Sequence, residues 1–180
     1  LISCQYGDGE VVKVLVEKGA DLRYVDCNTW NCLHFAAKGE HLGEYLQIVK
    51  FLIQNGADVH SVLSFYNYTA LFLAAEAGHA DIVKYLIHKG ADVKRLGYQK
   101  ISALHAASQR GHVDVVKILI ENGAVVNLVD GTKQSALLKA SVEGHADVVK
   151  LLIENGADVN TVDINKGAPL HAASQFGHVE

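Results

Sequence analysis

Short runs of apolar residues recur along this chain with the spacing of an amphipathic helix, and glycines separate them. In the segment 113–121 the apolar residues fall at i, i+1, i+4 and i+5, which places them on one face of a helix. They are Val115, Val116, Leu119 and Ile120. Lys117 and Glu121 take the opposite, solvent-facing side. The pattern predicts a helix that starts near Val113 and ends before Gly123, with one apolar face in the core.

A shorter helix is predicted just before this one. Ser102 is a candidate N-cap, because its hydroxyl can accept a hydrogen bond from the free amides of a first helical turn. The following segment, from Leu104 to Arg110, is rich in alanine, and small residues let neighbouring helices approach closely. Gly111 ends this helix at a turn, since glycine adopts a positive φ at little cost. After the second helix, the segment 125–134 is predicted to run out as a hairpin-like finger.

This unit of two helices and a finger repeats along the chain. Gly-Ala-Asp stands at 19–21, 56–58, 90–92 and 156–158, with Gly-Ala-Val at 123–125 as a variant. The glycines of these motifs lie 37, 34, 33 and 33 residues apart. Gly-His at 78–79, 111–112, 144–145 and 177–178 keeps the same phase, as does Leu-His at 33–34, 104–105 and 170–171. Three markers in one phase indicate a repeat protein.

The motifs resemble those of the ankyrin repeat family, whose unit carries Thr-Pro-Leu-His, Ala-Ala, Gly-His and Gly-Ala-Asp-Val-Asn. The last motif is complete at 156–160. The resemblance implies an all-α solenoid of stacked helix-turn-helix units with projecting β-hairpin or loop fingers, as a single domain over residues 1–180. Complete units fall at 26–62, 63–96, 97–129 and 130–162, and half-units at 1–25 and 163–180. Because both ends cut a unit, we expect a segment of a longer array.

One departure from the family pattern and one further resemblance are informative. The unit 26–62 is four residues too long, and we place the extra residues in a lengthened turn between its helices, within 38–44. Asn160 follows Asp158-Val159 and stands eight residues after Leu152. That arrangement resembles the pattern at which ankyrin-repeat asparagines are hydroxylated, and Asn127 matches it less well.

Composition and charge narrow the function classes. The chain is 49 % hydrophobic and 20 % charged with a net charge of −4, which is typical of a folded protein. Its 16 Lys and Arg are spread along the sequence, which argues against a nucleic-acid surface and a polybasic membrane anchor. No apolar run is long enough to span a bilayer. Cys4, Cys27 and Cys32 form no CxxC motif, and we expect buried or half-buried thiols of a cytoplasmic or cytosol-facing protein.

The sequence contains no recognisable active site, and we predict a non-enzymatic protein without cofactor or metal. Seven of the ten histidines stand at repeat positions, where the resemblance implies hydrogen bonds between neighbouring loops and helix starts. Chemistry would need convergent residues and not one histidine per unit. Cys32 near His34 could be a nucleophile and its base. However, Cys32 occupies the family's proline position, and no oxyanion donor accompanies the pair.

A protein-binding surface therefore remains as the predicted functional site. By the resemblance, finger tips and first-helix ends are left free for partners. The candidate partner-binding residues are Asn28, Trp30, Phe65, Tyr66, Tyr68, Tyr98, Gln99, Ile101, Gln109, Arg110, Thr132 and Gln134. Further candidates on the same surfaces are Lys38, Glu76, Glu143, Ile164, Asn165, Gln175 and Phe176. The finger aromatics are the strongest candidates, because Trp and Tyr are enriched among binding hot spots. The alternative is that these aromatics pack finger against finger.

Three functions stay open at this point. The first is a scaffold or adaptor that binds a folded domain or a peptide of another protein. The second is a targeting or regulatory arm of a larger enzyme or channel, such as a kinase, a ubiquitin ligase or a cation channel. The third is a structural spacer. We expect a monomeric segment of a longer chain that binds no nucleic acid and does not insert into a membrane.

Overall fold

The computed structural model describes residues 1–39 and 44–175. These residues form helices joined by loops, with isolated β-bridges in place of extended strands, so the predicted all-α repeat fold is confirmed. The chain divides into two compact units, unit 1 (Leu1–Asp92) and unit 2 (Val93–Glu180). The expectation of a single domain stays a prediction.

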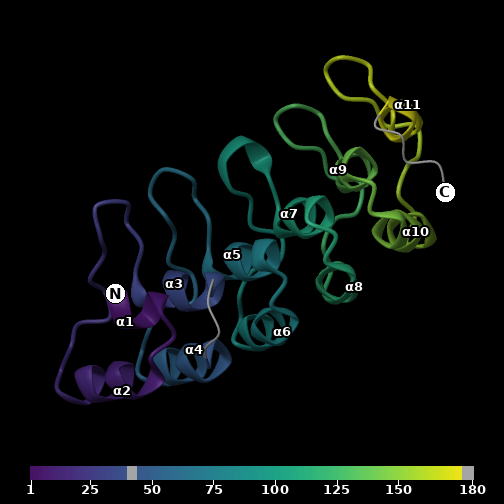
Figure 1. Cartoon of the computed structure of the whole chain (residues 1–180). Helices are drawn as coiled ribbons and strands as arrows, with labels where there is room; N and C mark the ends of the chain where they lie inside the picture. The colour runs from purple at the N-terminus through teal and green to yellow at the C-terminus, as the bar shows by residue number, and fades with distance from the viewer. Residues whose placement is uncertain (40–43, 176–180) are drawn as a thin grey trace. The chain divides into compact units, whose positions relative to one another are not determined.

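Unit 1 consists of three helix-turn-helix pairs arranged in two layers (Figure 1). The first layer contains α1 (Ile2–Gln5), α3 (Cys32–Lys38) and α5 (Ala70–Ala77), each packed against the next. The second layer contains α2 (Gly9–Glu17), α4 (Tyr45–Gln54) and α6 (Ala80–His88), which pack in the same order. Each first-layer helix also packs on the second-layer helix that follows it, so apolar faces of both layers are covered.

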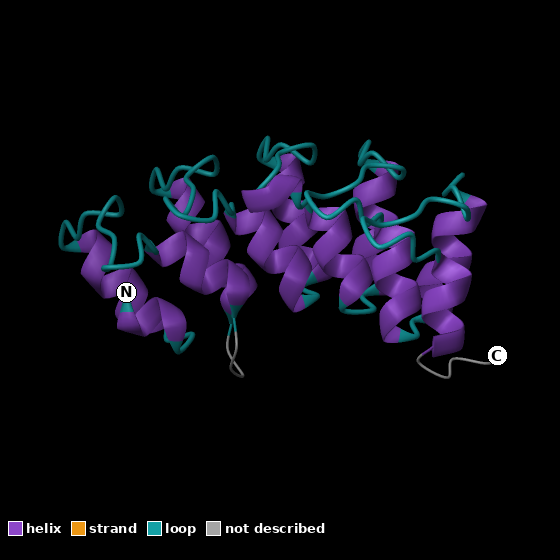
Figure 2. Cartoon of the chain, turned by 90° about the horizontal axis from the view of Figure 1, so that it is seen from above, coloured by secondary structure: helices purple, strands orange, loops and turns teal. Residues whose placement is uncertain are grey.

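Unit 2 repeats this arrangement. Its first layer contains α7 (Ala103–Gln109), α9 (Ala136–Glu143) and α11 (Pro169–Gln175), and its second layer contains α8 (Val113–Glu121) and α10 (Ala146–Glu154). A short 3-10 helix, η1 (Tyr98–Lys100), precedes α7. In both units the long loops, here called fingers, leave one side of the helices, and short turns lie on the other (Figure 2).

Ser102 caps α7 as predicted, and polar residues at the same position cap three more first-layer helices. The side chains of Asn31, Thr69, Ser102 and Ser135 each accept a hydrogen bond from the backbone N–H three residues later. Such a bond satisfies one of the amides that a helix start leaves unpaired. These helices are only seven or eight residues long. Helices so short are marginal alone, so the caps and the packing on neighbours hold them.

The predicted core stripe of α8 is confirmed with two changes. Val115, Val116 and Leu119 are buried, whereas Ile120 is only half-buried. Ile118, which the stripe left out, is 6 % exposed. The reason is that α8 contacts both α7 and α10, so its covered face is wider than a single stripe.

The connection between α3 and α4 is longer than its counterparts, as predicted. It runs over residues 39–44, while α5 and α6 are joined by Gly78 and His79 alone. Residues 40–43 of the predicted insertion lie outside the described residues. Gly39 begins the connection with φ +40°, and a Cβ there would come within 2.8 Å of the Tyr45 ring. Glycine is therefore required at this position both by conformation and by space.

The fingers begin and end as narrow loops. Single antiparallel bridges join Val62 to Thr69, Leu96 to Ser102 and Val129 to Ser135. Near the tip of each finger, at least one residue other than glycine adopts a left-handed backbone conformation with positive φ. The residues with this conformation in the five fingers are Thr29, Asn67, Gln99, Lys100, Lys133 and Lys166. Each repeat thus holds local strain at its finger tip, because a side chain at positive φ is disfavoured.

We expect Lys133→Gly to raise the free energy of unfolding by up to about 1 kcal/mol. A left-handed residue with a Cβ costs roughly 1–2 kcal/mol, and the larger unfolded-state entropy of glycine takes back about 0.5–1 kcal/mol. The Lys133 side chain is exposed, so little packing is lost. Denaturant unfolding of the full chain measures the change. Lys133→Ala keeps a Cβ at φ +61° and should stay within about 0.5 kcal/mol of the parent.

Candidate functional site

Four aromatic residues of unit 1 form a column from a finger tip to the core. Phe65 meets Tyr66 edge-on at 4.8 Å, and Tyr66 stacks on Tyr68 at 5.4 Å between ring centroids. Tyr68 stacks in turn on Phe72 of α5 at 3.9 Å. Phe65 is 75 % exposed and Tyr66 47 %, whereas Phe72 is buried. This aromatic column (Phe65, Tyr66, Tyr68, Phe72) therefore presents a large apolar surface on a base that is held by the fold.

Trp30 lies at the foot of the preceding finger and not at its tip. Its ring is half-buried, packs on Phe35 of α3 at 5.1 Å, and carries the Lys38 ammonium 5.5 Å from its centroid. A cavity of about 180 Å³ opens beside it. The cavity is lined by Gln5, Asp26, Asn28, Trp30, Phe35, Lys38 and Gly39. This Trp30 recess brings three predicted residues, Asn28, Trp30 and Lys38, to one place.

Unit 2 places another group of predicted residues on its surface. Tyr98 is 53 % exposed, Gln99 is exposed, and Ile101 is half-buried. Gln109 and Arg110 are exposed at the end of α7. Of the further candidates, Glu143, Ile164, Asn165 and Gln175 are exposed, and Glu76 in unit 1 is half-buried. Phe176 lies outside the described residues.

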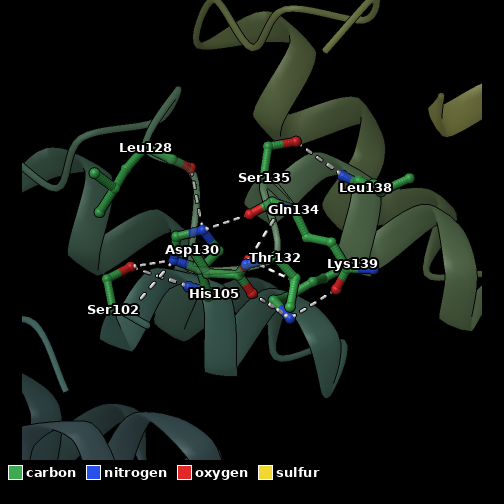
Figure 3. A network of polar contacts seen from close by, with 9 residues as sticks. All are labelled: Ser102, His105, Leu128, Asp130, Thr132, Gln134, Ser135, Leu138 and Lys139. Carbon is green, nitrogen blue, oxygen red and sulfur yellow. Dashed lines mark hydrogen bonds and ion pairs between the residues drawn. The ribbon is translucent and has the colours of Figure 1, made fainter. Parts of the chain in front are cut away.

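Thr132 and Gln134, also predicted to bind a partner, take part in a polar network inside unit 2 (Figure 3). One oxygen of the Asp130 carboxylate accepts from the Thr132 N–H at 2.8 Å, the Thr132 hydroxyl at 2.7 Å and the Gln134 N–H at 3.0 Å. The other oxygen lies 3.0 Å from the Lys139 ammonium, which also donates to the Gln134 side chain at 3.1 Å. The structure thus uses these two side chains to shape the finger itself.

The same network includes a buried imidazole. His105 Nδ1 accepts from the Ser102 backbone N–H at 3.2 Å, and Nε2 faces the carbonyl oxygens of Leu128 and Gln134, both at 3.1 Å. The ring is therefore neutral, with its hydrogen on Nε2. Burial lowers the pKa of His105 to about 4, although Asp130 nearby works in the opposite direction. His105 fastens its finger to α7.

Other repeat histidines are structural in the same way, as predicted. His34 faces the Ser61 carbonyl at 3.1 Å, and the Asn31 N–H meets its second ring nitrogen at 3.3 Å. His79 contacts the carbonyls of Lys38 and Gly39, and His145 contacts that of Gln109. Because both ring nitrogens of His34 bind backbone groups, this ring does not act as a base for Cys32.

The cysteines follow the expectation in two of three cases. Cys4 is buried and Cys32 is half-buried, but Cys27 is exposed, so the expectation of a buried or half-buried thiol is wrong for Cys27. It lies in the first finger, where the chain turns away from the helices.

Asn160, the candidate for hydroxylation, is also exposed. The side chain of Asn127, the weaker candidate, forms hydrogen bonds with the backbone of Gly156 and Asp158.

Hydrogen bonds join neighbouring fingers within each unit. In unit 1 the Ser64 N–H donates to the Thr29 hydroxyl at 2.7 Å. In unit 2 the Gly131 N–H donates to the Gln99 carbonyl at 2.6 Å, and the Ile164 N–H to the Thr132 carbonyl at 3.2 Å. The fingers of a unit are thus fixed to each other, and a partner meets a prearranged surface.

Sequence reasoning missed Phe35 and Phe72, the residues on which Trp30 and Tyr68 rest. Phe72 stands in the position that His34 and His105 hold in their repeats, so an aromatic residue at that position was an available signal.

Over residues 1–39 and 44–175, no helix is long and apolar enough to cross a membrane. The same part of the chain brings no three metal-ligating side chains together.

Comparison with known proteins identifies the type of repeat. The sequence model for ankyrin repeats (three copies) matches residues 1–97, 43–130 and 104–180. Over 88 residues, 49 % of this chain, the sequence is 38 % identical to human palmitoyltransferase ZDHHC13 and 36 % identical to the mouse protein. Over 54 residues, 30 % of this chain, it is 44 % identical to an L-asparaginase of Dirofilaria immitis. The matches cover 14 % of each palmitoyltransferase and 8 % of the asparaginase.

Proposed function

The chain belongs to the ankyrin repeat family, and from this membership we propose that it is a non-enzymatic interaction module that holds another protein. The partner contacts the aromatic column and the Trp30 recess of unit 1, and Tyr98, Gln99, Gln109 and Arg110 give unit 2 a second contact area. We further propose that the module acts in the cytosol as a monomeric part of a longer protein. Its partner is a folded domain or an extended peptide.

The observation that carries this proposal is the exposure of the aromatic column. Phe65 and Tyr66 leave 75 % and 47 % of their surface in water, although each would gain by burial. Stacking on Tyr68 and Phe72 fixes the rings in advance. A partner that covers them therefore orders few rotatable bonds, and aromatic anchors of this kind carry much of the energy of protein interfaces.

The Trp30 recess complements the column. An aromatic side chain of the partner would pack beside the Trp30 ring, while Asn28 and Asp26 in the lining offer polar groups. Lys38 places a cation over the same ring. The lining thus combines two aromatic rings, Trp30 and Phe35, with polar and charged side chains, and a side chain with an apolar body and a polar tip fits such a recess.

A second candidate function is an arm of a larger enzyme. The relatives reported above are named as a palmitoyltransferase and an L-asparaginase, and the matched stretch is a small part of each. In such a protein the repeats would bring a substrate protein to a catalytic domain elsewhere in the chain. Sequencing the complete open reading frame distinguishes this function from that of a free adaptor.

We expect Tyr66→Ala to weaken partner binding by about 1–2 kcal/mol, or roughly 5- to 30-fold in Kd. Its ring is half exposed and lies outside the helices, so helicity should be unchanged. The partner is first recovered by pull-down with the intact chain and mass spectrometry, and each variant is then titrated against it by calorimetry.

Asn165→Ala is the matched control, because Asn165 is exposed on a finger without aromatic residues. Thr132→Ala is unsuitable, since Thr132 supports the Asp130 network. If Tyr66→Ala binds normally but melts at lower temperature, the column is a packing element. The binding surface then has to be sought around Gln109, Arg110 and Glu143.

A further inference from the structure

Two of the three cysteines meet where the first helices of unit 1 pack together. Cys4 lies on α1 and is 1 % exposed, and Cys32 is the first residue of α3. The two helices pack side by side (Figure 1). Both side chains line one cavity of about 250 Å³, together with Ser3, Val12 and Leu15. The two thiols are close enough to shift each other's pKa.

The repeat register explains why these two side chains are so close. Counting from the Leu-His and Gly-His motifs, Cys4 corresponds to Ala37 and Cys32 to Ala70 of the next helix pair, α3 and α5. Ala37 and Ala70 are both fully buried. In unit 2 the same positions hold Ser108 and Ala136, which are also buried. Alanine and serine fill these positions in both pairs, and such small residues let the two helices approach closely, as a disulfide between them requires.

We propose that Cys4 and Cys32 form a reversible dithiol–disulfide site, oxidised by peroxides, which covalently joins α1 to α3. The Cys32 thiolate attacks hydrogen peroxide, takes one oxygen to become a sulfenic acid and releases hydroxide. The Cys4 sulfur then attacks the Cys32 sulfur, and the hydroxyl group leaves as water. In total, two thiols and one peroxide give one disulfide and two waters. A dithiol reductant reverses the change by thiol–disulfide exchange.

The environment divides the two roles between the cysteines. The interaction between the two thiols lowers the pKa of Cys32 and raises that of Cys4. Cys32 is half-buried and thus within reach of a small oxidant, while Cys4 is buried behind it. Cys32 is therefore the attacking residue and Cys4 the resolving one. Cys27 is exposed in the first finger and serves as an internal reference thiol.

The experiment uses the full chain treated with hydrogen peroxide, with remaining thiols then blocked by iodoacetamide. Intact mass should show the loss of two hydrogens, and only Cys27 should carry the alkyl group. Peptide mapping without reductant should recover one peptide pair linked through Cys4 and Cys32, and dithiothreitol should separate it. The thermal midpoint of the oxidised chain should rise, because the crosslink restricts the unfolded state.

Alanine variants provide the controls, since alanine fills the same positions in the next pair of helices. Cys27→Ala should still lose two hydrogens. Cys4→Ala should lose none, and its Cys32 should be trapped by dimedone as sulfenic acid. The proposal is wrong if the parent chain keeps three alkylatable thiols under conditions that label Cys32 in Cys4→Ala. It is equally wrong if the linked peptides contain Cys27 or join two chains.

Discussion

Lys139→Met is expected to lower the free energy of unfolding by about 3–5 kcal/mol. The Lys139 ammonium and the Asp130 carboxylate form an ion pair whose side chains are 10 % and 7 % exposed. Methionine keeps the length of the side chain and removes its charge, so the carboxylate stays buried without a counter-ion. The Thr132 and Gln134 donors remain, which places the expected loss toward the lower end of this range. Urea unfolding followed by circular dichroism measures it.

Lys13→Met is the control for this substitution. Lys13 also forms an ion pair, with Glu10, but the two side chains are 44 % and 85 % exposed. Exposed pairs contribute little, so this variant should leave the free energy of unfolding almost unchanged. Adding Asp130→Asn to Lys139→Met removes the unpaired charge and should recover part of the loss. Equal effects of Lys13→Met and Lys139→Met would show that burial of the second pair is unimportant.

Acidification from pH 6.5 to 4 should lower the free energy of unfolding by about 3 kcal/mol through His105 alone. Burial lowers the pKa of His105 from its ordinary 6.5 to about 4. In the unfolded chain this residue gains a proton below pH 6.5, whereas in the folded chain it gains one only near pH 4. The unfolded state therefore binds more protons within this window, and stability falls as the pH falls. Below pH 4 both states are protonated, and the loss from His105 is complete.

His105→Leu tests the assignment, because Leu138 occupies the same position of the next repeat and is buried there. The variant loses the bonds to Leu128 and Gln134 and should be less stable at pH 7. Between pH 6.5 and 4, however, its stability should fall by about 3 kcal/mol less than that of the parent. Urea midpoints measured across this range give both slopes. Parallel slopes would assign the acid sensitivity to other groups, such as His34, whose pKa burial also lowers.

Most of the fold could be predicted from the sequence, because residues within each repeat mark where its helices begin and end. Ser102 and Gly111 mark the ends of α7, and the start of α8 at Val113 follows from the apolar spacing. The width of the buried face of α8 was harder to predict from the sequence. Ile118 is covered because α8 has neighbours on two sides, and that coverage depends on packing between repeats.

The exposed aromatic residues of the candidate site could be named from the sequence, but their supports and their arrangement could not. Exposed aromatics could be listed from finger positions, yet the stacking of Tyr66 on Tyr68 and Phe72 depends on where the finger returns to α5. Thr132 and Gln134 were chosen as tip residues, but the Asp130 carboxylate draws them inward. A polar residue in a loop can serve the loop or a partner, and only the position of its neighbours decides between these roles.

The imidazole that fastens a finger is not present in every repeat. In unit 1 His34 on α3 is followed by Phe72 on α5, and in unit 2 His105 on α7 is followed by Leu138 on α9. Protonation of a buried finger histidine therefore weakens alternate repeats. Since a repeat array is stabilised by contacts between neighbours, such local weakening breaks its cooperativity. In mild acid each unit should pass through a partly opened state, with one finger exchanging its amide hydrogens before the others.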